Sequence, residues 1–361
     1  MSLNYDPETY QPGWPVVGHE RAVETLRRIL RSGIVPHAYL FTGPPGSGKR
    51  TLALAYAMAL NCLAEPTPGQ TWPDVPCGLC SSCSRIAHGS HPDIVEINLE
   101  TQARNNGEAA ARSKTGPAKE LRIEVIREMQ ETVGLTPHSG RWRVLIIGDA
   151  ERLNEEASNC LLKTLEEPPG HTVLMMLASD ESLVLPTVAS RCFVVPLQGI
   201  SRDAIARALR ERWHADREQA DLLAALADGR LGTAVGLLER PETLSRRKAA
   251  LEVAALLVGA SMLERVAVAT RLAKMYTDDR PGLHAYLDAW EGWWRDVMAA
   301  GAGAQELAAG IDQASAIAST ARRISPRRAA EAIALVQTAR RQLQENVNPR
   351  LALEALTLGL P

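Results

Sequence analysis

A glycine-rich loop between an apolar strand and an apolar helix is the feature that most constrains this fold. Residues 38–42 are apolar, residues 43–51 read Gly-Pro-Pro-Gly-Ser-Gly-Lys-Arg-Thr, and an apolar helix is predicted at 52–60. This order is the setting of a phosphate-binding loop. Backbone N–H groups and the helix N-terminus attract a phosphate there, and Lys49 would reach its β- and γ-phosphates. The sequence therefore predicts a phosphate-binding α/β fold.

The loop departs from the usual pattern at one position. The hydroxyl residue expected after Gly-Lys as an Mg²⁺ ligand is replaced by Arg50, and Thr51 comes one residue late. This argues against bound Mg²⁺ and leaves two interpretations open, a site that binds ATP or ADP and an inherited loop that is now structural. The predicted nucleotide-contacting residues of the loop are Gly43, Pro44, Gly46, Ser47, Gly48, Lys49, Arg50 and Thr51.

Length and composition exclude several classes of protein. The 361 residues leave room for two or three domains, and a net charge of −2 excludes a strongly basic nucleic-acid binder. Any contact with DNA would be a local patch. No apolar run reaches the ~18 residues of a membrane span, and the polar N-terminus is unlike a secretory signal. We therefore expect a cytoplasmic protein that makes no contact with a membrane.

Four of the six cysteines form a cluster with the spacing of a metal site. Cys62, Cys77, Cys80 and Cys83 follow the pattern C-x14-C-x2-C-x2-C. Four thiolates complete a tetrahedral Zn²⁺ shell and leave no position for water, so the predicted site is structural. His88 and His91 are rival ligands in sequence, but four cysteines leave them unneeded. Free buried thiols are the alternative interpretation.

Strands and helices alternate after the cysteine segment. A buried strand from Arg143 is predicted to end at Asp149, the carboxylate that orders Mg²⁺ and its water in a phosphate-loop ATPase. The next position, where a glutamate would activate the water, is Ala150, and Glu151 is expected to point elsewhere. The other predictions here are a strand at 94–97, a polar loop at 101–120, a helix at 123–133, a helix at 155–166, a strand at 172–178 and a strand at 193–195.

Taken in order, these parts resemble a clamp-loader subunit of bacterial DNA polymerase III, of the delta-prime type, within the AAA+ superfamily. Two runs carry the resemblance beyond the loop, the cysteines and Asp149: Leu-Leu-Lys-Thr-Leu-Glu-Glu-Pro-Pro at 161–169 and Ser-Arg-Cys at 190–192. A third, weaker match begins Asn-Val-Asn-Pro-Arg at 346. The resemblance implies that Arg191 is an arginine finger acting on a neighbour's nucleotide. It also implies that Ser179 is a sensor of the γ-phosphate.

The resemblance implies three domains. These are an AAA+ parallel-sheet domain at 1–199 with its zinc module at 62–83, a helical lid at 200–240, and an all-helical collar for oligomerisation at 241–361. The helical period predicts collar helices at 246–259, 262–276, 282–300, 311–324 and 326–346. Trp290, Trp293 and Trp294 share a helix face there, which favours a core or a subunit contact. The implied partners are gamma/tau and delta clamp-loader subunits, the sliding clamp, and primed DNA through the assembled complex.

Three positions that ATP hydrolysis uses in the family are altered together. Arg50 replaces the Mg²⁺ hydroxyl, Ala150 the water-activating carboxylate, and Gly232 the lid arginine. Single transition-state contacts of this kind typically contribute ~10²-fold or more to the rate. The sequence therefore predicts a largely non-hydrolysing stator that supplies Arg191 to a neighbouring ATPase. The alternatives are an active gamma/tau-type motor, a zinc-containing phosphate-loop kinase, and a pure scaffold.

Overall fold

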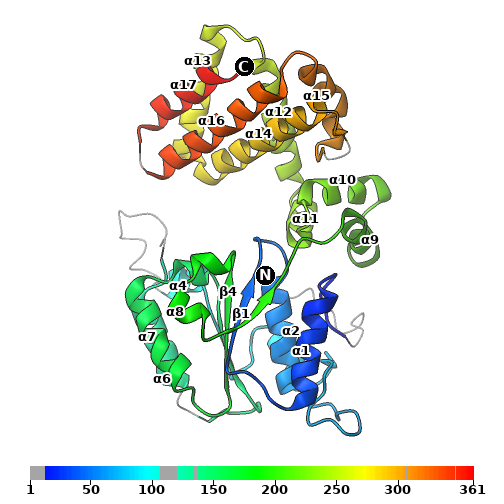
Figure 1. The fold of residues 1–361 in the computed structure, drawn as a ribbon, viewed down its shortest axis with the longest axis vertical. Coiled ribbons are helices and arrows are strands. Elements are labelled where there is room, and N and C mark those ends of the chain that lie inside the picture. Colours follow the sequence, from blue (N-terminus) through cyan, green and yellow to red (C-terminus); the bar gives the residue numbers. More distant parts are fainter. Residues whose placement is uncertain (1–12, 106–119, 134–135, 306–307, 346) are drawn as a thin grey trace. The chain divides into compact units, whose positions relative to one another are not determined.

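The computed structural model describes residues 13–105, 120–133, 136–305, 308–345 and 347–361, and the chain divides into two compact units (Figure 1). The first unit runs to Ile200 and includes Arg230–Gly232. The second comprises Ser201–Gly229 and Thr233–Pro361. The predicted division of this second part into a lid and a collar stays a prediction.

The first unit is built on a parallel sheet of five strands in the order β2-β3-β4-β1-β5. Every residue of the three central strands is buried, which explains their continuous apolar runs. The strands are β1 (Ala38–Thr42), β2 (Ile94–Ile97), β3 (Arg143–Ile147), β4 (Thr172–Ala178) and β5 (Phe193–Pro196). β3 thus ends two residues before Asp149, earlier than the sequence predicted, because Gly148 and Asp149 already belong to the following turn.

Helices cover both faces of this sheet (Figure 1). Side chains alternate along β1, so Tyr39 and Phe41 pack against α1 (Glu20–Ser32) and α2 (Lys49–Asn61). Ala38 and Leu40 belong to the opposite core, which α6 (Ile123–Val133) and α7 (Glu155–Glu166) complete. This three-layer arrangement, with the phosphate loop between β1 and α2, confirms the predicted α/β fold class.

Short elements connect these layers. They are α3 (Ser81–Ala87), α4 (Leu99–Asn105), η1 (Ala150–Arg152), η2 (Glu181–Leu183) and α8 (Pro186–Ala189). The helix α4 contradicts the loop predicted from residue 101, and residues 106–119 of that loop lie outside the described part. Asn98 explains the helix, because its Oδ1 accepts the Thr101 N–H at 2.8 Å and its own N–H donates to Thr101 Oγ1 at 2.8 Å.

The described secondary structure of the second unit is all helical, as the sequence predicted, and α11 (Leu231–Glu239) begins with two residues that belong to the first unit. Its core contains Trp290 and Trp294, both with 0% exposure, so the tryptophan face is buried within the chain. Trp290 Nε1 donates to Ala250 O at 2.9 Å. The helices are α9 (Arg202–Trp213), α10 (Arg217–Ala227), α11 (Leu231–Glu239), α12 (Pro241–Leu257), α13 (Met262–Asp278), α14 (Arg280–Gly301), η4 (Ile311–Gln313), α15 (Ala314–Ala321), α16 (Pro326–Gln344) and α17 (Pro349–Gly359).

Several details of this unit differ from the sequence expectation, including α12, which begins at Pro241 and not at the predicted residue 246. The helix predicted at 311–324 is divided into η4 and α15, and α17 was not predicted as a helix. The start of α17 had a signal, since Asn348 caps it by accepting the Arg350 N–H at 3.0 Å and Pro349 occupies its first turn. Among the described helices, none combines the length and the apolar character needed to cross a membrane.

Candidate nucleotide and metal sites

Backbone contacts fix the start of the phosphate loop, directly after β1. Gly43 N donates to Ala178 O at 3.2 Å, which joins the start of the loop to the end of β4. A Cβ at Gly43 would stand 2.3 Å from Leu197 O, so only glycine fits. Gly48 adopts φ 97° immediately before α2, a left-handed conformation that glycine allows. The predicted strand, loop and helix are therefore present, with α2 beginning at Lys49 itself.

Donors from the protein itself engage the carbonyl groups of the loop. The Lys49 ammonium donates to Gly43 O and, at 3.1 Å, to Pro44 O. His19, just before α1, lies with Nε2 2.8 Å from Ser47 O. Burial lowers the pKa of Lys49, and the nearby carboxylates of Glu151 and Asp149 oppose that shift. The Lys49 ammonium would therefore have to break its hydrogen bonds to these loop carbonyls before it could reach a β- or γ-phosphate.

Arg50 forms a forked ion pair with Glu96 on β2. Its Nε donates to Oε1, and its NH2 nitrogen lies 2.6 Å from Oε2. The hydrogen bond with Glu96 raises the pKa of Arg50. The position at which a phosphate-loop ATPase presents a hydroxyl to Mg²⁺ therefore holds a fixed guanidinium. Thr51 follows within α2 as the third helical residue.

The two acidic residues after β3 accept hydrogen bonds from different parts of the first unit. Asp149 has φ 53°, and its Oδ2 accepts the Leu99 N–H at 3.3 Å. Glu151 was expected to point away from the place of a water-activating carboxylate, and the short helix η1 turns it toward the end of β4. There its Oε1 accepts Ser179 Oγ–H at 2.6 Å and the Ser179 N–H at 3.3 Å. Its Oε2 is buried and has no hydrogen bond among the described residues. The structure thus brings the predicted sensor to a carboxylate that sequence reasoning had set aside.

Gly232 lies directly against the phosphate loop. Its N–H donates to Gly46 O at 2.9 Å. A Cβ built at Gly232 would stand 2.9 Å from that oxygen and 3.1 Å from Gly46 Cα. Both distances are shorter than ordinary contacts with a Cβ atom, so the arginine expected at this position in hydrolysing relatives would not fit here.

Arg191 lies at the opposite end of the sheet from the loop. Because β1 and β5 run parallel with Phe193 opposite Tyr39, four residue steps separate the start of β5 from the level of Gly43. At ~3.3 Å a step this is about 13 Å along the strands. The guanidinium is held at that far end by Glu166 Oε1, 2.8 Å from NH2, and by Thr187 O, 2.9 Å from NH1. Arg191 therefore cannot serve the phosphate loop of its own chain.

The four predicted cysteines form a compact cluster. The Sγ atoms of Cys62, Cys77, Cys80 and Cys83 all lie within 4.8 Å of one another. Four thiolates around Zn²⁺ at about 2.3 Å would be about 3.8 Å apart. Backbone N–H groups of Leu63 and Cys83 donate to Cys80 Sγ at 3.5 and 3.4 Å. The donor set and its spacing fit a closed tetrahedral metal site.

The thiols differ in their surroundings. A hydrogen bond with the Cys83 thiol, against the effect of burial, lowers the pKa of Cys62. His88 and His91 lie outside the cluster. His91 is buried between Ser82 Oγ, at 3.2 Å, and the Asp93 N–H, at 3.2 Å, while His88 Nδ1 bonds Ser84 O at 2.7 Å. The four cysteines are thus the ligand atoms that the described residues bring together.

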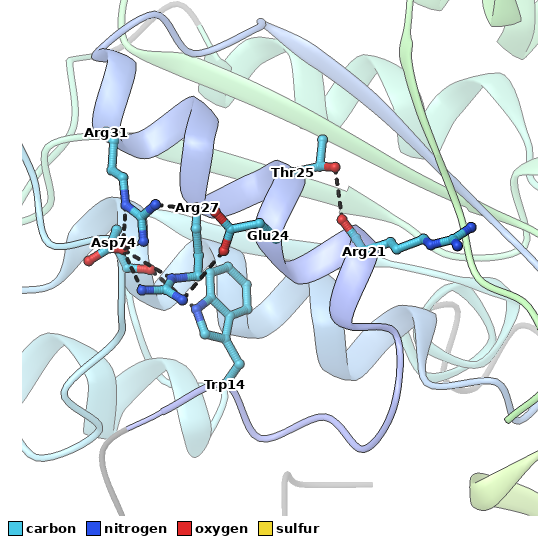
Figure 2. A network of polar contacts seen from close by, with 7 residues as sticks. All are labelled: Trp14, Arg21, Glu24, Thr25, Arg27, Arg31 and Asp74. Carbon is cyan, nitrogen blue, oxygen red and sulfur yellow. Dashed lines mark hydrogen bonds and ion pairs between the residues drawn. The ribbon is translucent and has the colours of Figure 1, made fainter. Parts of the chain in front are cut away.

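An ion-pair network joins the cysteine segment to α1 (Figure 2). Asp74 Oδ2 accepts from Nε and NH2 of both Arg27 and Arg31 at 2.7–3.0 Å. Trp14 Nε1 donates to Asp74 O at 3.2 Å, and Glu24 pairs with both arginines. Burial would raise the pKa of Asp74, but the two guanidinium groups hold it below its usual value. The segment that carries the candidate metal ligands is therefore fixed to the first helix.

Comparison with known families decides the family of the chain. The family described as DNA polymerase III, delta subunit, matches residues 18–201, which is more than half of the 361 residues. The chain belongs to this DNA polymerase III delta subunit family. A second family, described as the C-terminal part of the delta subunit, matches residues 269–360. The family predicted from the sequence motifs is confirmed.

The named relatives are also subunits of DNA polymerase III. DNA polymerase III subunit tau of Bacillus subtilis is 32% identical over 250 residues, which cover 68% of this chain and 40% of that protein. The delta′ subunit of Pseudomonas aeruginosa is 36% identical over 197 residues, covering 54% of this chain and 53% of that protein. The chain thus matches less than two thirds of the length of either relative. A gamma subunit-related protein of Thermotoga maritima, of known structure, is similar with a TM-score of 0.40 and 17% identity, covering 94% and 98% of the two chains.

Proposed function

We propose that this chain is a cytoplasmic, delta-prime-type clamp-loader subunit that hydrolyses little or no ATP and completes the ATPase site of a neighbouring subunit with Arg191. The observation that carries the proposal is the separation of Arg191 from the phosphate loop of its own chain. The start of β5, two residues after Arg191, is about 13 Å along the strands from the level of Gly43, which supports a role for this guanidinium toward a phosphate on another molecule. A planar, permanently charged fork suits such a phosphate.

Several contacts support weak hydrolysis by the chain itself. Arg50 is committed to Glu96, Lys49 is bound to loop carbonyls, and Ser179 is bound to Glu151. Gly232 offers only its backbone to the loop. ATP or ADP binding at residues 43–51 with Asp149 and Ser179 is compatible with these contacts, but the groups that would order Mg²⁺ and activate a water are engaged elsewhere or missing.

We also propose that Cys62, Cys77, Cys80 and Cys83 hold one structural Zn²⁺. Four thiolates with no room for a water ligand suit Zn²⁺, which would staple the segment after α2 without taking part in catalysis. The proposed partners are gamma/tau- and delta-type subunits, the sliding clamp, and primed DNA reached through the complex. The kinase alternative gains no support from the family match.

The test is a reconstituted complex in which only this subunit is altered. Arg191→Ala should leave the subunit folded and assembled, but lower ATP turnover at the neighbouring site by about 10³-fold and slow clamp loading. Arg191→Lys should restore little, because an ammonium lacks the forked geometry. If turnover and loading were both unchanged, Arg191 would have only a structural role and the proposal would be abandoned.

An active gamma/tau-type motor is the second candidate. It is favoured by the match to subunit tau, which extends over more of this chain than the match to subunit delta′. Steady-state phosphate release by the isolated chain separates the two candidates, since a motor keeps its own turnover and a stator does not.

A further inference from the structure

Arg191 is held by a carboxylate on a neighbouring helix. Glu166 ends α7 and lies 2.8 Å from the NH2 nitrogen, while Thr187 O on α8 lies 2.9 Å from NH1. NH1 and NH2 form one edge of the guanidinium, and such an edge pairs with two phosphate oxygens in bidentate recognition. In this structure each of its nitrogens therefore already donates to a protein acceptor.

The backbone around this contact is fixed, so only side chains can rearrange. Arg191 N donates to Val188 O at 3.1 Å, and Val188 is 1% exposed. On the other side, Leu161 and Leu165 anchor α7 in the core with 0% and 3% exposure. By contrast, the side chains of Arg191 and Glu166 are 38% and 51% exposed. Exposed ion pairs of this kind are weak, so a competing anion can open this one.

We propose that Glu166 is a positioning residue that holds Arg191 in a resting conformation, from which the nucleotide phosphate of a neighbouring subunit displaces it. This inference rests on the proposed arginine-finger function. The Glu166 carboxylate neutralises the positive charge on Arg191 that would attract a phosphate. It also accepts the hydrogen bond of one of the two terminal nitrogens of the guanidinium. The neighbour's ATP must therefore compete with Glu166 for the same guanidinium, which weakens apparent ATP affinity until the pair opens.

The chain offers a matched control. Glu167 is the next residue, carries the same charge and is exposed, but it forms no ion pair within the described residues. Glu166→Gln and Glu167→Gln remove the same charge from adjacent positions. Only the first removes the carboxylate from Arg191, so any effect of overall charge at this end of α7 appears in both variants.

The experiment measures ATP turnover of the reconstituted complex as ATP concentration is varied, with only this subunit altered. Glu166→Gln should lower the ATP concentration for half-maximal turnover by about 1.5- to 5-fold, the range that an exposed ion pair produces, with little change in the maximal rate. Glu167→Gln should leave both values unchanged. In an Arg191→Ala background, Glu166→Gln should have no further effect, which a merely structural role would not predict.

The possible failures are distinguishable. If Arg191→Ala lowers turnover but Glu166→Gln leaves the half-maximal ATP concentration unchanged or raises it, the resting contact is refuted and the arginine finger stands. An equal effect of Glu166→Gln with and without Arg191 also refutes the contact. If Arg191→Ala changes nothing, the proposed function fails first.

Discussion

The charged side chains at the two ends of the parallel sheet differ in how far they are engaged within the chain. At the end where the strands finish, Lys49, Arg50 and Glu151 are turned onto partners within the same unit. At the end where the strands begin, Arg191 stays accessible, with one exposed glutamate and one carbonyl as acceptors. The difference teaches that a phosphate-loop fold can have the polar groups of its own loop engaged within the chain while the opposite end of the sheet, which carries the proposed arginine finger, keeps an exposed guanidinium.

The largest expected effect concerns the candidate metal, at the end where the strands begin. Structural zinc contributes on the order of 10 kcal/mol to the folding of small zinc peptides. Protein purified without chelator should contain one Zn²⁺ per chain by elemental analysis. Cys62→Ser should lose the metal and loosen the segment 62–83 in hydrogen exchange, while the phosphate loop stays folded. Metal-free wild-type protein would refute the site.

The second largest expected effect concerns the rate of ATP hydrolysis at the phosphate loop, at the opposite end of the sheet. The isolated chain should release phosphate from ATP at least ~10²-fold more slowly than an ordinary AAA+ motor, because three contacts are altered. Arg50→Ser alone should not restore turnover, since Ala150 and Gly232 remain. Arg191→Ala should leave this residual rate of the isolated chain unchanged. A motor-like rate in contaminant-free protein would break the contrast between the two ends.

The fit of Gly232 against the loop can be tested with a matched pair in α11. Gly232→Ala places a Cβ against Gly46 and should destabilise the protein by about 1–3 kcal/mol through overpacking. Gly236 lies in the same helix, and a Cβ there meets nothing within 4 Å. Gly236→Ala should therefore stabilise by roughly 0.5–1 kcal/mol. Thermal midpoints of the two variants check the sign, and equal shifts would show that the loop contact does not form in solution.

The smallest effect is a pH dependence at the end where the strands begin. Asp93 precedes β2 and accepts the N–H groups of His138, Ser139 and Gly140 at 2.6–2.8 Å. Burial would raise the pKa of Asp93, but these bonds lower it to about 2. Because the folded pKa is lower than the unfolded one, the stabilisation is present above about pH 4 and is lost as pH falls toward 2.

This dependence can be isolated by difference. The stability advantage of wild type over Asp93→Asn, measured by urea unfolding, should be about 2 kcal/mol near neutral pH and shrink as pH falls from 5 to 2.5. An advantage that stays constant over this range would show that Asp93 keeps its ordinary pKa.

Much of the fold was predictable because its signals are local. The strand, glycine loop and helix at 38–61 and the spacing of the cysteines lie within short stretches, and helices α6 and α7 have the bounds predicted from their apolar period. The cap of α4 by Asn98 and Thr101 was also a local signal, but the polar composition around it concealed the helix.

The candidate site was less predictable because its contacts join distant residues. Arg50 and Glu96 are 46 positions apart, and Glu151 and Ser179 are 28 apart. The sequence showed that Arg50 stands in place of a hydroxyl residue. Which carboxylate pairs with Arg50 depends on the order of the strands in the sheet, which places Glu96 of β2 within reach. Likewise, Gly232 was identified as a missing arginine, whereas its close approach to Gly46 depends on the folded backbone.

Because α1 is held by contacts at both ends, the number of residues between these contacts and their rotation about the helix axis are both fixed. This 13-residue helix, about 20 Å long, is held near its end by Asp74 and, just before its start, touches the phosphate loop through His19. One residue inserted before Arg27 would rotate the arginines by about 100° relative to His19. The two contacts could then not form together, so α1 should tolerate substitutions on its exposed face but no insertion or deletion between His19 and Arg27.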